Sequence, residues 1–153
     1  MNASRLCAAF ALVAATALPA AAETPFATEI EARQGQFKLL AINVGPLVGM
    51  AQGQVPYDAV LARQAADNLV AIAGLHQGVL WPEGSDNAAV AGTRALPAIW
   101  EDIEDFGTRL AALRSATADL QGVAGDGLEA VQGAIGPVGA ACSSCHQAYR
   151  APQ

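Results

Sequence analysis

The sequence predicts an all-α protein folded as an antiparallel four-helix bundle with up-down-up-down connections. After the first two dozen residues, apolar side chains recur at intervals of three and four, the period of an amphipathic helix, and the alternation typical of strands is missing. The pattern divides into four segments of roughly 18 to 25 residues that are joined mostly by short turns. Four such helices bury their apolar faces most simply by packing against one another as a bundle.

Residues 1–22 have the features of a secretory signal peptide. Arg5 supplies one positive charge, residues 6–18 are almost wholly apolar, and alanines at 20–22 provide the small residues that cleavage requires. The apolar run is shorter than the roughly 20 residues that span a membrane, and the rest of the chain has no second candidate. We therefore expect residues 1–22 to be removed, leaving one domain, residues 23–153, in the periplasm without a membrane span.

Cleavage would discard Cys7 and Arg5 with the signal peptide. The mature chain would keep two cysteines, Cys142 and Cys145, which belong to one motif and leave no thiol for a structural disulfide. Seven basic residues would face fourteen acidic ones, a net charge near −7. Phosphate binding requires clustered Lys and Arg, so this balance argues against a nucleic acid partner.

The first predicted helix spans about residues 28–49 and the second about residues 57–74. Thr28 and Glu31 match a capping box at the first N-terminus. Pro46 removes a backbone hydrogen bond and crowds the preceding turn, so we expect a bend or an early end there. The inward-facing stripe of the first helix is Ile30, Phe37, Ala41, Val44 and Val48, and that of the second is Leu61, Ala65, Leu69 and Ile72.

A long connection, residues 80–93, is rich in Gly, Pro, Ser and Asn and lacks any periodicity. The third predicted helix starts near Pro97, a residue suited to the first helical position, and ends at the glycines of residues 122–127. Its stripe is the most regular in the chain and comprises Leu96, Ile99, Ile103, Phe106, Leu110, Leu113, Thr117 and Leu120.

The last predicted helix follows Asp126, which is placed to cap its N-terminus. Pro137 lies within the helix and follows a glycine, so the helix is expected either to kink or to restart there. The apolar stripe continues to the cysteines and comprises Leu128, Val131, Ile135, Val138, Cys142, Cys145 and Tyr149. Both thiols are therefore expected to face the core.

Cys142, Cys145 and His146 form the Cys-x-x-Cys-His motif that attaches a c-type haem through two thioether bonds and one axial imidazole. Residues three apart share a helix face, so both thiols can reach one edge of the porphyrin. We expect one haem c per chain, bound covalently through Cys142 and Cys145, with His146 as the iron ligand. Covalent attachment retains the porphyrin even when one coordination position of the iron stays open. The haem would also fill part of the core, so the apoprotein should be less stable.

Two other uses of the motif are less consistent with the sequence. A dithiol redox pair belongs in a βαβ unit, and no strand pattern accompanies these cysteines. A structural zinc ion needs four ligands, whereas the mature chain would offer two Cys and two His, with His76 far from the motif. His76 is interpreted as a polar residue near the end of the second predicted helix.

Four stretches carry a resemblance to a known family, and they are residues 33–37 (Arg-Gln-Gly-Gln-Phe), 56–59 (Pro-Tyr-Asp-Ala), 97–100 (Pro-Ala-Ile-Trp) and 142–150. The chain resembles the cytochromes c′, the class II c-type cytochromes, over its whole mature length. The haem motif alone occurs in any c-type cytochrome. Its C-terminal position, followed by Tyr149 and Arg150, is what points to class II.

The resemblance implies roles for three further residues. Phe37 would cover the distal face of the iron, and because phenylalanine cannot bind a metal, the iron would be five-coordinate and high-spin. Arg33 would bond a haem propionate, for which a guanidinium is well suited, and Arg150 would lie beside the proximal imidazole. Trp81 and Trp100 are interpreted as packing residues, although Trp81 falls where the family's long loop approaches the haem edge.

The resemblance further implies that the protein binds small gases, NO and CO, for NO sequestration or tolerance, with a redox partner and an electron-transfer role left open. The alternative is a low-spin electron-transfer cytochrome with a methionine ligand. Met50, the only mature methionine, lies ~20 Å from Phe37 along a helix and cannot reach the same iron.

Peroxide catalysis would need a distal acid or base, which Phe37 does not supply, so we do not expect an enzyme. Many members of the family are homodimers through their first two helices, and the resemblance therefore favours a homodimer. The sequence leaves the physiological ligand and the redox partner undecided.

Overall fold

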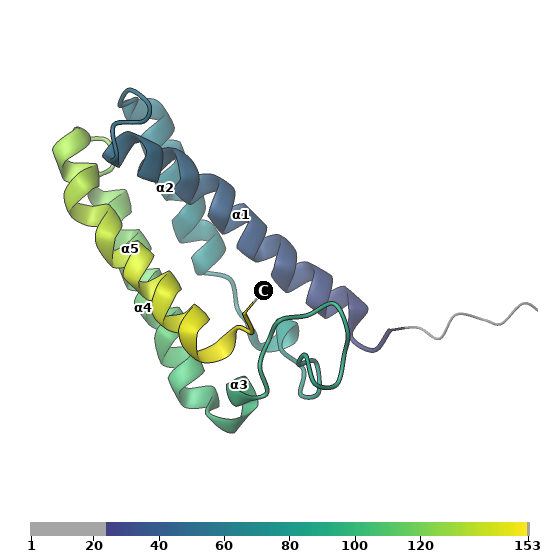
Figure 1. Ribbon diagram of the computed structural model, residues 1–153. Helices are drawn as coiled ribbons and strands as arrows, with labels where there is room; N and C mark the ends of the chain where they lie inside the picture. Colours follow the sequence, from purple (N-terminus) through teal and green to yellow (C-terminus); the bar gives the residue numbers. More distant parts are fainter. Residues whose placement is uncertain (1–23, 153) are drawn as a thin grey trace, which may run out of the picture.

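Four helices pack side by side in the computed structural model, which describes residues 24–152 (Figure 1). They are α1 (Ala27–Ala51), α2 (Ala59–Ala73), α4 (Ile103–Val123) and α5 (Leu128–Tyr149). Two short elements, η1 (Gly78–Leu80) and α3 (Ala98–Glu101), lie in the long connection between α2 and α4. The predicted signal peptide, residues 1–22, lies outside the described residues.

Each long helix packs against two neighbours, α1 against α2 and α5, and α4 against α2 and α5. Short turns make α1 and α2, and likewise α4 and α5, antiparallel pairs (Figure 1). The predicted four-helix bundle is therefore confirmed. Its core is built from Leu40, Leu47, Met50, Ala62, Ala65, Ala66, Leu69, Leu113, Leu120, Val131 and Val138, with further small residues between them. The prediction that Leu61 faces inward is wrong, because it lies in the first turn of α2 and is 42 % exposed. No helix within residues 24–152 has the length and apolarity needed to cross a membrane.

The helix α1 does not end at Pro46 but continues to Ala51, so of the two expected outcomes, a bend or an early end, the early end is wrong. Pro46 cannot donate to the carbonyl of Ile42, yet Ile42 is 67 % exposed and lies on the side of the helix that water reaches. Leu47 and Met50 follow the proline and are fully buried. Burial of two such side chains contributes about 3–6 kcal/mol, which outweighs the roughly 3 kcal/mol cost of the proline.

The helix α5 likewise runs through Pro137 without restarting. The carbonyl that loses its donor belongs to Gly133, an exposed position without a side chain to exclude water. Val138, directly after the proline, is fully buried. The segment that carries the cysteines is therefore continuous with the rest of α5.

Two helix N-termini differ from the prediction. The helix α1 begins after Phe26, which has a left-handed backbone (φ 57°), so Thr28 lies inside the first turn and no side-chain cap forms. The helix α5 begins after Gly127, whose φ of 131° favours glycine, and the side chain of Asp126 does not cap it. Asp58 is a cap that the periodicity did not reveal, because its carboxylate accepts two backbone N–H groups in the first turn of α2.

The third predicted helix is two helices. Asp102 has a non-helical backbone (φ −139°, ψ 71°) that ends α3, and its side chain accepts the N–H of Asp105 at 3.0 Å to begin α4. The apolar stripe continues across this break, which is why periodicity alone predicted one helix. The break turns Ile103 outward, whereas Ile99 and Phe106 remain buried.

Arg33 ties the connection between α2 and α4 to α1. Arg33 is 2 % exposed, and its guanidinium donates to the carbonyl of Leu80 at 3.2 Å and to the hydroxyl of Ser85 at 2.7 Å. It also donates to the carbonyl of Ser85 and to the hydroxyl of Thr93, the latter at 2.9 Å. The charge lies over the ring of Trp81, 4.5 Å from the centroid.

Within the described residues, no carboxylate lies at ion-pair distance from Arg33. Burial lowers the pKa of this guanidinium, and the charge of Asp86 acts in the opposite direction. The cation is therefore stabilised mainly by neutral acceptors. Those acceptors are the last residue of η1, Leu80, and two residues of the irregular loop that follows it, so the loop depends on Arg33 for its position.

Replacing this guanidinium tests that dependence. Arg33→Met keeps an apolar stem but donates nothing, so each buried acceptor left without a donor should cost about 1–3 kcal/mol. Denaturant unfolding should show the loss, and the backbone N–H groups of residues 85–93 should exchange with solvent faster than in the parent protein.

Arg63→Met is the matched control, because Arg63 is exposed and makes one bond, to the carbonyl of Gly125 at 3.2 Å. Equal losses of stability and protection in the two variants would contradict the role assigned to Arg33.

Candidate functional site

A cavity of about 500 Å³ opens between α1, α4, α5 and the connection that Arg33 holds. Its walls are mainly apolar and include Leu40, Ala41 and Val44 of α1 and Leu110 and Leu113 of α4. Cavities of this size are typical of small-molecule and cofactor sites. Ala41 and Val44 belong to the predicted inward-facing stripe of the first helix, so part of that stripe faces the cavity.

Cys142, Cys145 and His146 line the cavity from the C-terminal part of α5. The two cysteines are one helical turn apart and are half-buried, and neither is in a disulfide. Burial raises the pKa of both thiols. The cysteines therefore present protonated thiols to the cavity at neutral pH, both on the face that the periodicity predicts.

The imidazole of His146 is suited to binding a metal. Burial lowers the pKa of His146, and the nearby charges of Arg150 and Arg94 lower it further. A neutral imidazole keeps a lone pair available for a metal ion. Arg150, predicted to lie beside the imidazole, lines the same cavity, and its charge is one cause of this lowered pKa.

Aromatic rings form one wall of the cavity. Phe37 and Trp81 meet edge to face with centroids 6.2 Å apart, and Trp81 meets Phe106 in the same way at 4.8 Å. Phe106 in turn packs edge to face against Tyr149 at 5.4 Å. All four residues line the cavity. Trp81 thus packs as predicted and also faces the cavity, while the helix α1 supplies only a hydrocarbon ring at Phe37.

Five cationic side chains line the cavity, and none of its lining residues is an aspartate or a glutamate. The cations are Arg33, Lys38, Arg94, Arg109 and Arg150. The sequence as a whole is acidic, so this concentration of positive charge is local. It suits a ligand that carries carboxylates.

Sequence reasoning missed Lys38, Arg94 and Arg109 as members of this set. Lys38 follows Phe37 directly and could have been found from that position, whereas Arg94 lies in a segment without periodicity and gives no signal. Arg33 was predicted to bond a propionate, but its two terminal nitrogens are engaged by the loop. Only its Nε–H is left for such a bond.

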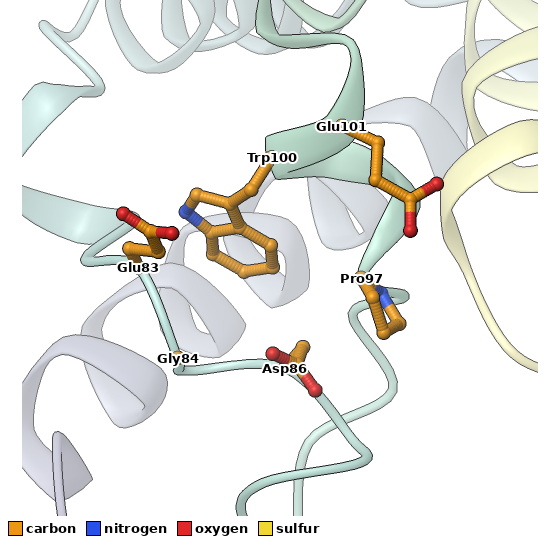
Figure 2. Close-up of a pocket in the computed structure, with 6 residues that line it drawn as sticks. All are labelled: Glu83, Gly84, Asp86, Pro97, Trp100 and Glu101. Carbon is orange, nitrogen blue, oxygen red and sulfur yellow. The ribbon is translucent and has the colours of Figure 1, made fainter.

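A second, smaller pocket of about 320 Å³ lies outside the cavity (Figure 2). Its lining includes Glu83, Asp86, Glu101 and the ring of Trp100. Trp100 donates through Nε1 to the carbonyl of Trp81 at 3.2 Å, in keeping with its predicted packing role. No group of three or more His, Cys, Asp or Glu among residues 24–152 is arranged to hold a metal ion, and His76 is exposed.

The donor groups of the cavity fit a c-type haem. Two thiols on one helix face can form the thioether bonds, and the adjacent neutral imidazole can bind the iron. The aromatic and aliphatic walls suit a porphyrin plane, and the surrounding cations suit its two propionates. The large cavity, rather than the acidic pocket of Figure 2, is therefore the candidate site for the haem.

Comparison with known proteins agrees with this geometry. The family profile described as Cytochrome C′ matches residues 28–150. Cytochrome c-554 of Cereibacter sphaeroides is 44 % identical over 121 residues, which cover 79 % of each chain. The solved cytochrome c′ of Rhodobacter sphaeroides superposes with a TM-score of 0.82 at 38 % identity, covering 84 % of this chain and 98 % of that one.

Two further solved structures describe particular states of such proteins. One is a nitric oxide complex of a cytochrome c′ variant from Alcaligenes xylosoxidans, with a TM-score of 0.73, 29 % identity and coverage of 84 % and 97 % of the two chains. The other is a cytochrome c′ with ligand-controlled dimer dissociation, with a TM-score of 0.73, 32 % identity and coverage of 86 % and 100 %. The fold, the Cys-x-x-Cys-His motif in its cavity and these similarities together establish that the chain belongs to the cytochrome c′ family, whose members carry covalently bound haem c.

Proposed function

We propose that the protein binds nitric oxide and carbon monoxide at a five-coordinate haem iron whose single protein ligand is His146. When bound, the ferrous haem supplies an iron centre that takes up a diatomic gas. The observation that carries the proposal is the aromatic wall at Phe37, which offers a hydrocarbon ring and no ligating atom. NO sequestration is the physiological role that fits best with such a site.

The residues around His146 support single ligation from α5. Burial and the charges of Arg150 and Arg94 keep the imidazole neutral, so its lone pair is free for the iron. The cofactor-binding set that we propose is Cys142, Cys145, His146, Arg33, Phe37 and Arg150. Lys38 and Arg94 join it as cations for the propionates.

Phe37 is proposed to act as a steric gate. A gas molecule reaching the iron from the side of α1 would have to displace its ring. The ring cannot turn freely, because its neighbour Trp81 packs against it and is itself held under the guanidinium of Arg33. Entry should therefore be slow and restricted to small ligands. The nitric oxide complex of the cytochrome c′ variant from Alcaligenes xylosoxidans supports NO as one of them.

The low-spin electron-transfer alternative lacks a ligand. Met50 is 1 % exposed, belongs to the packed core and is not among the residues that line the cavity. A haem without a second protein ligand can still exchange electrons while it binds gases. The proposal therefore includes a redox partner protein. We propose no enzymatic role, because no carboxylate lines the cavity to act as a distal acid or base.

We further propose that the protein is a periplasmic homodimer. Export rests on the signal-like residues 1–22. Dimerisation rests on the large apolar side chains that α1 and α2 expose, which are Leu39, Ile42, Val60 and Leu61. Exposed apolar groups of this size on neighbouring helices are typical of contact surfaces between subunits. The relative with ligand-controlled dimer dissociation supports the same arrangement.

The gate and the ligation state can be tested together. Ferric and ferrous wild-type protein should give high-spin visible spectra, and the ferrous spectrum should shift when carbon monoxide is added. Phe37→Ala should raise the CO association rate by at least about tenfold, the factor that corresponds to a barrier lower by about 1.4 kcal/mol.

Leu75→Ala is the control for this change, because Leu75 is exposed, does not line the cavity and is not among the side chains proposed for the dimer contact. Unchanged association in Phe37→Ala would show that Phe37 does not guard the iron. A low-spin spectrum unaffected by CO would instead favour the electron-transfer alternative.

The dimer proposal is tested by charge. Ile42→Glu should shift the protein from dimer to monomer in sedimentation at a fixed concentration, because burying an unpaired carboxylate between subunits is unfavourable. Val79→Glu should leave the dimer intact, since Val79 is 78 % exposed but lies in η1. A dimer that survives Ile42→Glu would place the interface elsewhere.

A further inference from the structure

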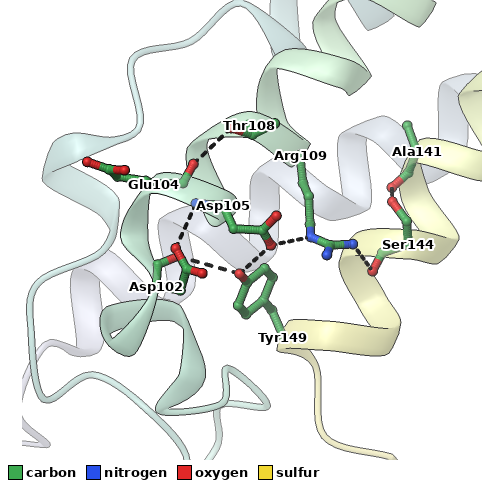
Figure 3. A network of polar contacts seen from close by, with 8 residues as sticks. All are labelled: Asp102, Glu104, Asp105, Thr108, Arg109, Ala141, Ser144 and Tyr149. Carbon is green, nitrogen blue, oxygen red and sulfur yellow. Dashed lines mark hydrogen bonds and ion pairs between the residues drawn. The ribbon is translucent and has the colours of Figure 1, made fainter.

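A polar network joins α4 to the C-terminal end of α5 (Figure 3). One carboxylate oxygen of Asp105 accepts two bonds, from the hydroxyl of Tyr149 at 2.6 Å and from Nε of Arg109 at 2.6 Å. The Tyr149 hydroxyl also lies 3.4 Å from the carbonyl of Asp102. A single acidic side chain of α4 therefore organises both a cation of its own helix and a phenol of the neighbouring one.

Arg109 extends this network into the haem motif. Its Nη1 donates to the backbone carbonyl of Ser144 at 2.9 Å, and Ser144 is the residue directly before Cys145 (Figure 3). Arg109 also lines the cavity together with Cys145 and His146. The guanidinium thus connects Asp105 of α4 to the peptide group that leads into the second thiol.

Tyr149 holds the same segment from its other side. It lies three residues after His146, is 7 % exposed and packs its ring against Phe106. Burial raises the pKa of Tyr149 to about 12, and its bond to Asp105 acts in the same direction, so the hydroxyl remains a donor. The backbone that carries His146 is accordingly fixed on both sides, at Ser144, two residues before it, and at Tyr149, three residues after it.

The imidazole itself has no comparable support. Among residues 24–152, no side chain donates to or accepts from the ring of His146 within hydrogen-bond distance. A metal-binding histidine usually gains its orientation from a bond to its second ring nitrogen. Here the orientation has to come from the backbone that carries the ring, and the network is what fixes that backbone.

The energetics separate this role from ordinary stabilisation. The side chains of Asp105 and Arg109 are 37 % and 30 % exposed, and ion pairs with this exposure add little to global stability. Their geometry is nevertheless specific, because the guanidinium of Arg109 donates at once to the Asp105 carboxylate and to the Ser144 carbonyl. Loss of the network should therefore alter the position of His146 while lowering the free energy of unfolding only slightly.

We propose that Arg109 and Asp105 are positioning residues of the haem site, which fix the turn of α5 bearing Cys145 and His146 and so set how the imidazole meets the iron. The proposal rests on covalent haem attachment and is independent of which gas, if any, the protein binds. Its readout is therefore taken on the gas-free protein.

The test is the iron–histidine stretching band in the resonance Raman spectrum of the ferrous holoprotein. Arg109→Gln and Asp105→Asn should each shift or broaden this band. Tyr149→Phe removes one hydroxyl and should shift the band in the same direction as Arg109→Gln and Asp105→Asn do. Arg109→Lys keeps the charge but can satisfy only one of the two acceptors, so its band should lie between those of wild type and Arg109→Gln.

Arg114→Gln is the matched control. Arg114 belongs to the same helix and also donates to a backbone carbonyl of a neighbouring helix, that of Ala73 at 3.0 Å, but it does not line the cavity. The iron–histidine band of the Arg114→Gln variant should match that of wild type, even if the substitution lowers the midpoint temperature of thermal unfolding.

A wild-type band in Arg109→Gln and Asp105→Asn, in protein that carries haem, would overturn the proposal. An equal shift in Arg114→Gln would also overturn it, because the effect would then be general loosening of the bundle. Should Arg109→Gln fail to mature, Tyr149→Phe and Arg109→Lys decide the question in the same way. Failure of gas binding alone would leave this band unaffected and would bear only on the proposed function.

Discussion

The placement of two thiols and an imidazole within one turn of a single helix is the constraint on which the rest of the structure depends. Cys142, Cys145 and His146 all lie on α5 and line the cavity, so one helix would supply both thioether bonds and the imidazole that hold the haem. The other three helices can only enclose its plane by packing. The continuity of α5 through Pro137 therefore matters, because a restart there would change the angle at which the haem-bearing turn faces the other helices.

The two faces of the haem site are built by different means. On the side of α5 the chain supplies the groups that would bond the haem, and its backbone is anchored to α4 by Arg109 and Tyr149. On the side of α1 the chain supplies only side chains that pack, namely Phe37 and the ring of Trp81 against it. The proposed selectivity for small ligands would follow from this asymmetry, since entry would be limited by rearranging packed rings and no bond to the iron would have to be broken.

Much of the fold could be predicted because helical periodicity and a covalent motif are local signals. The stripes correctly placed Leu69, Leu120 and Val131 in the core, and the motif spacing placed both cysteines on the cavity side. Errors arose where a single residue overrides periodicity. Asp102 splits a regular stripe by capping, and the buried side chains after Pro46 carry α1 past a residue that usually ends a helix.

The polar part of the site was less predictable because its partners are distant in sequence. The acceptors of Arg33 lie 47 to 60 residues away in a loop without any periodic pattern. Arg109 and Ser144 are 35 residues apart and meet only once α4 and α5 have packed. The residue type indicates that an arginine will pair with anions or carbonyl oxygens, but only the tertiary structure determines which of them it contacts.

The buried charge of Arg33 has a consequence for the redox chemistry of the site. A fixed cation in surroundings of low polarity acts over a longer range than one in water. Arg33 lines the cavity and has no carboxylate at ion-pair distance within residues 24–152. If a haem occupies the cavity, a cation at this position would disfavour the higher charge of the ferric iron and would so tend to raise the reduction potential. The residue that orders the loop would thereby also bias the oxidation state of the bound metal.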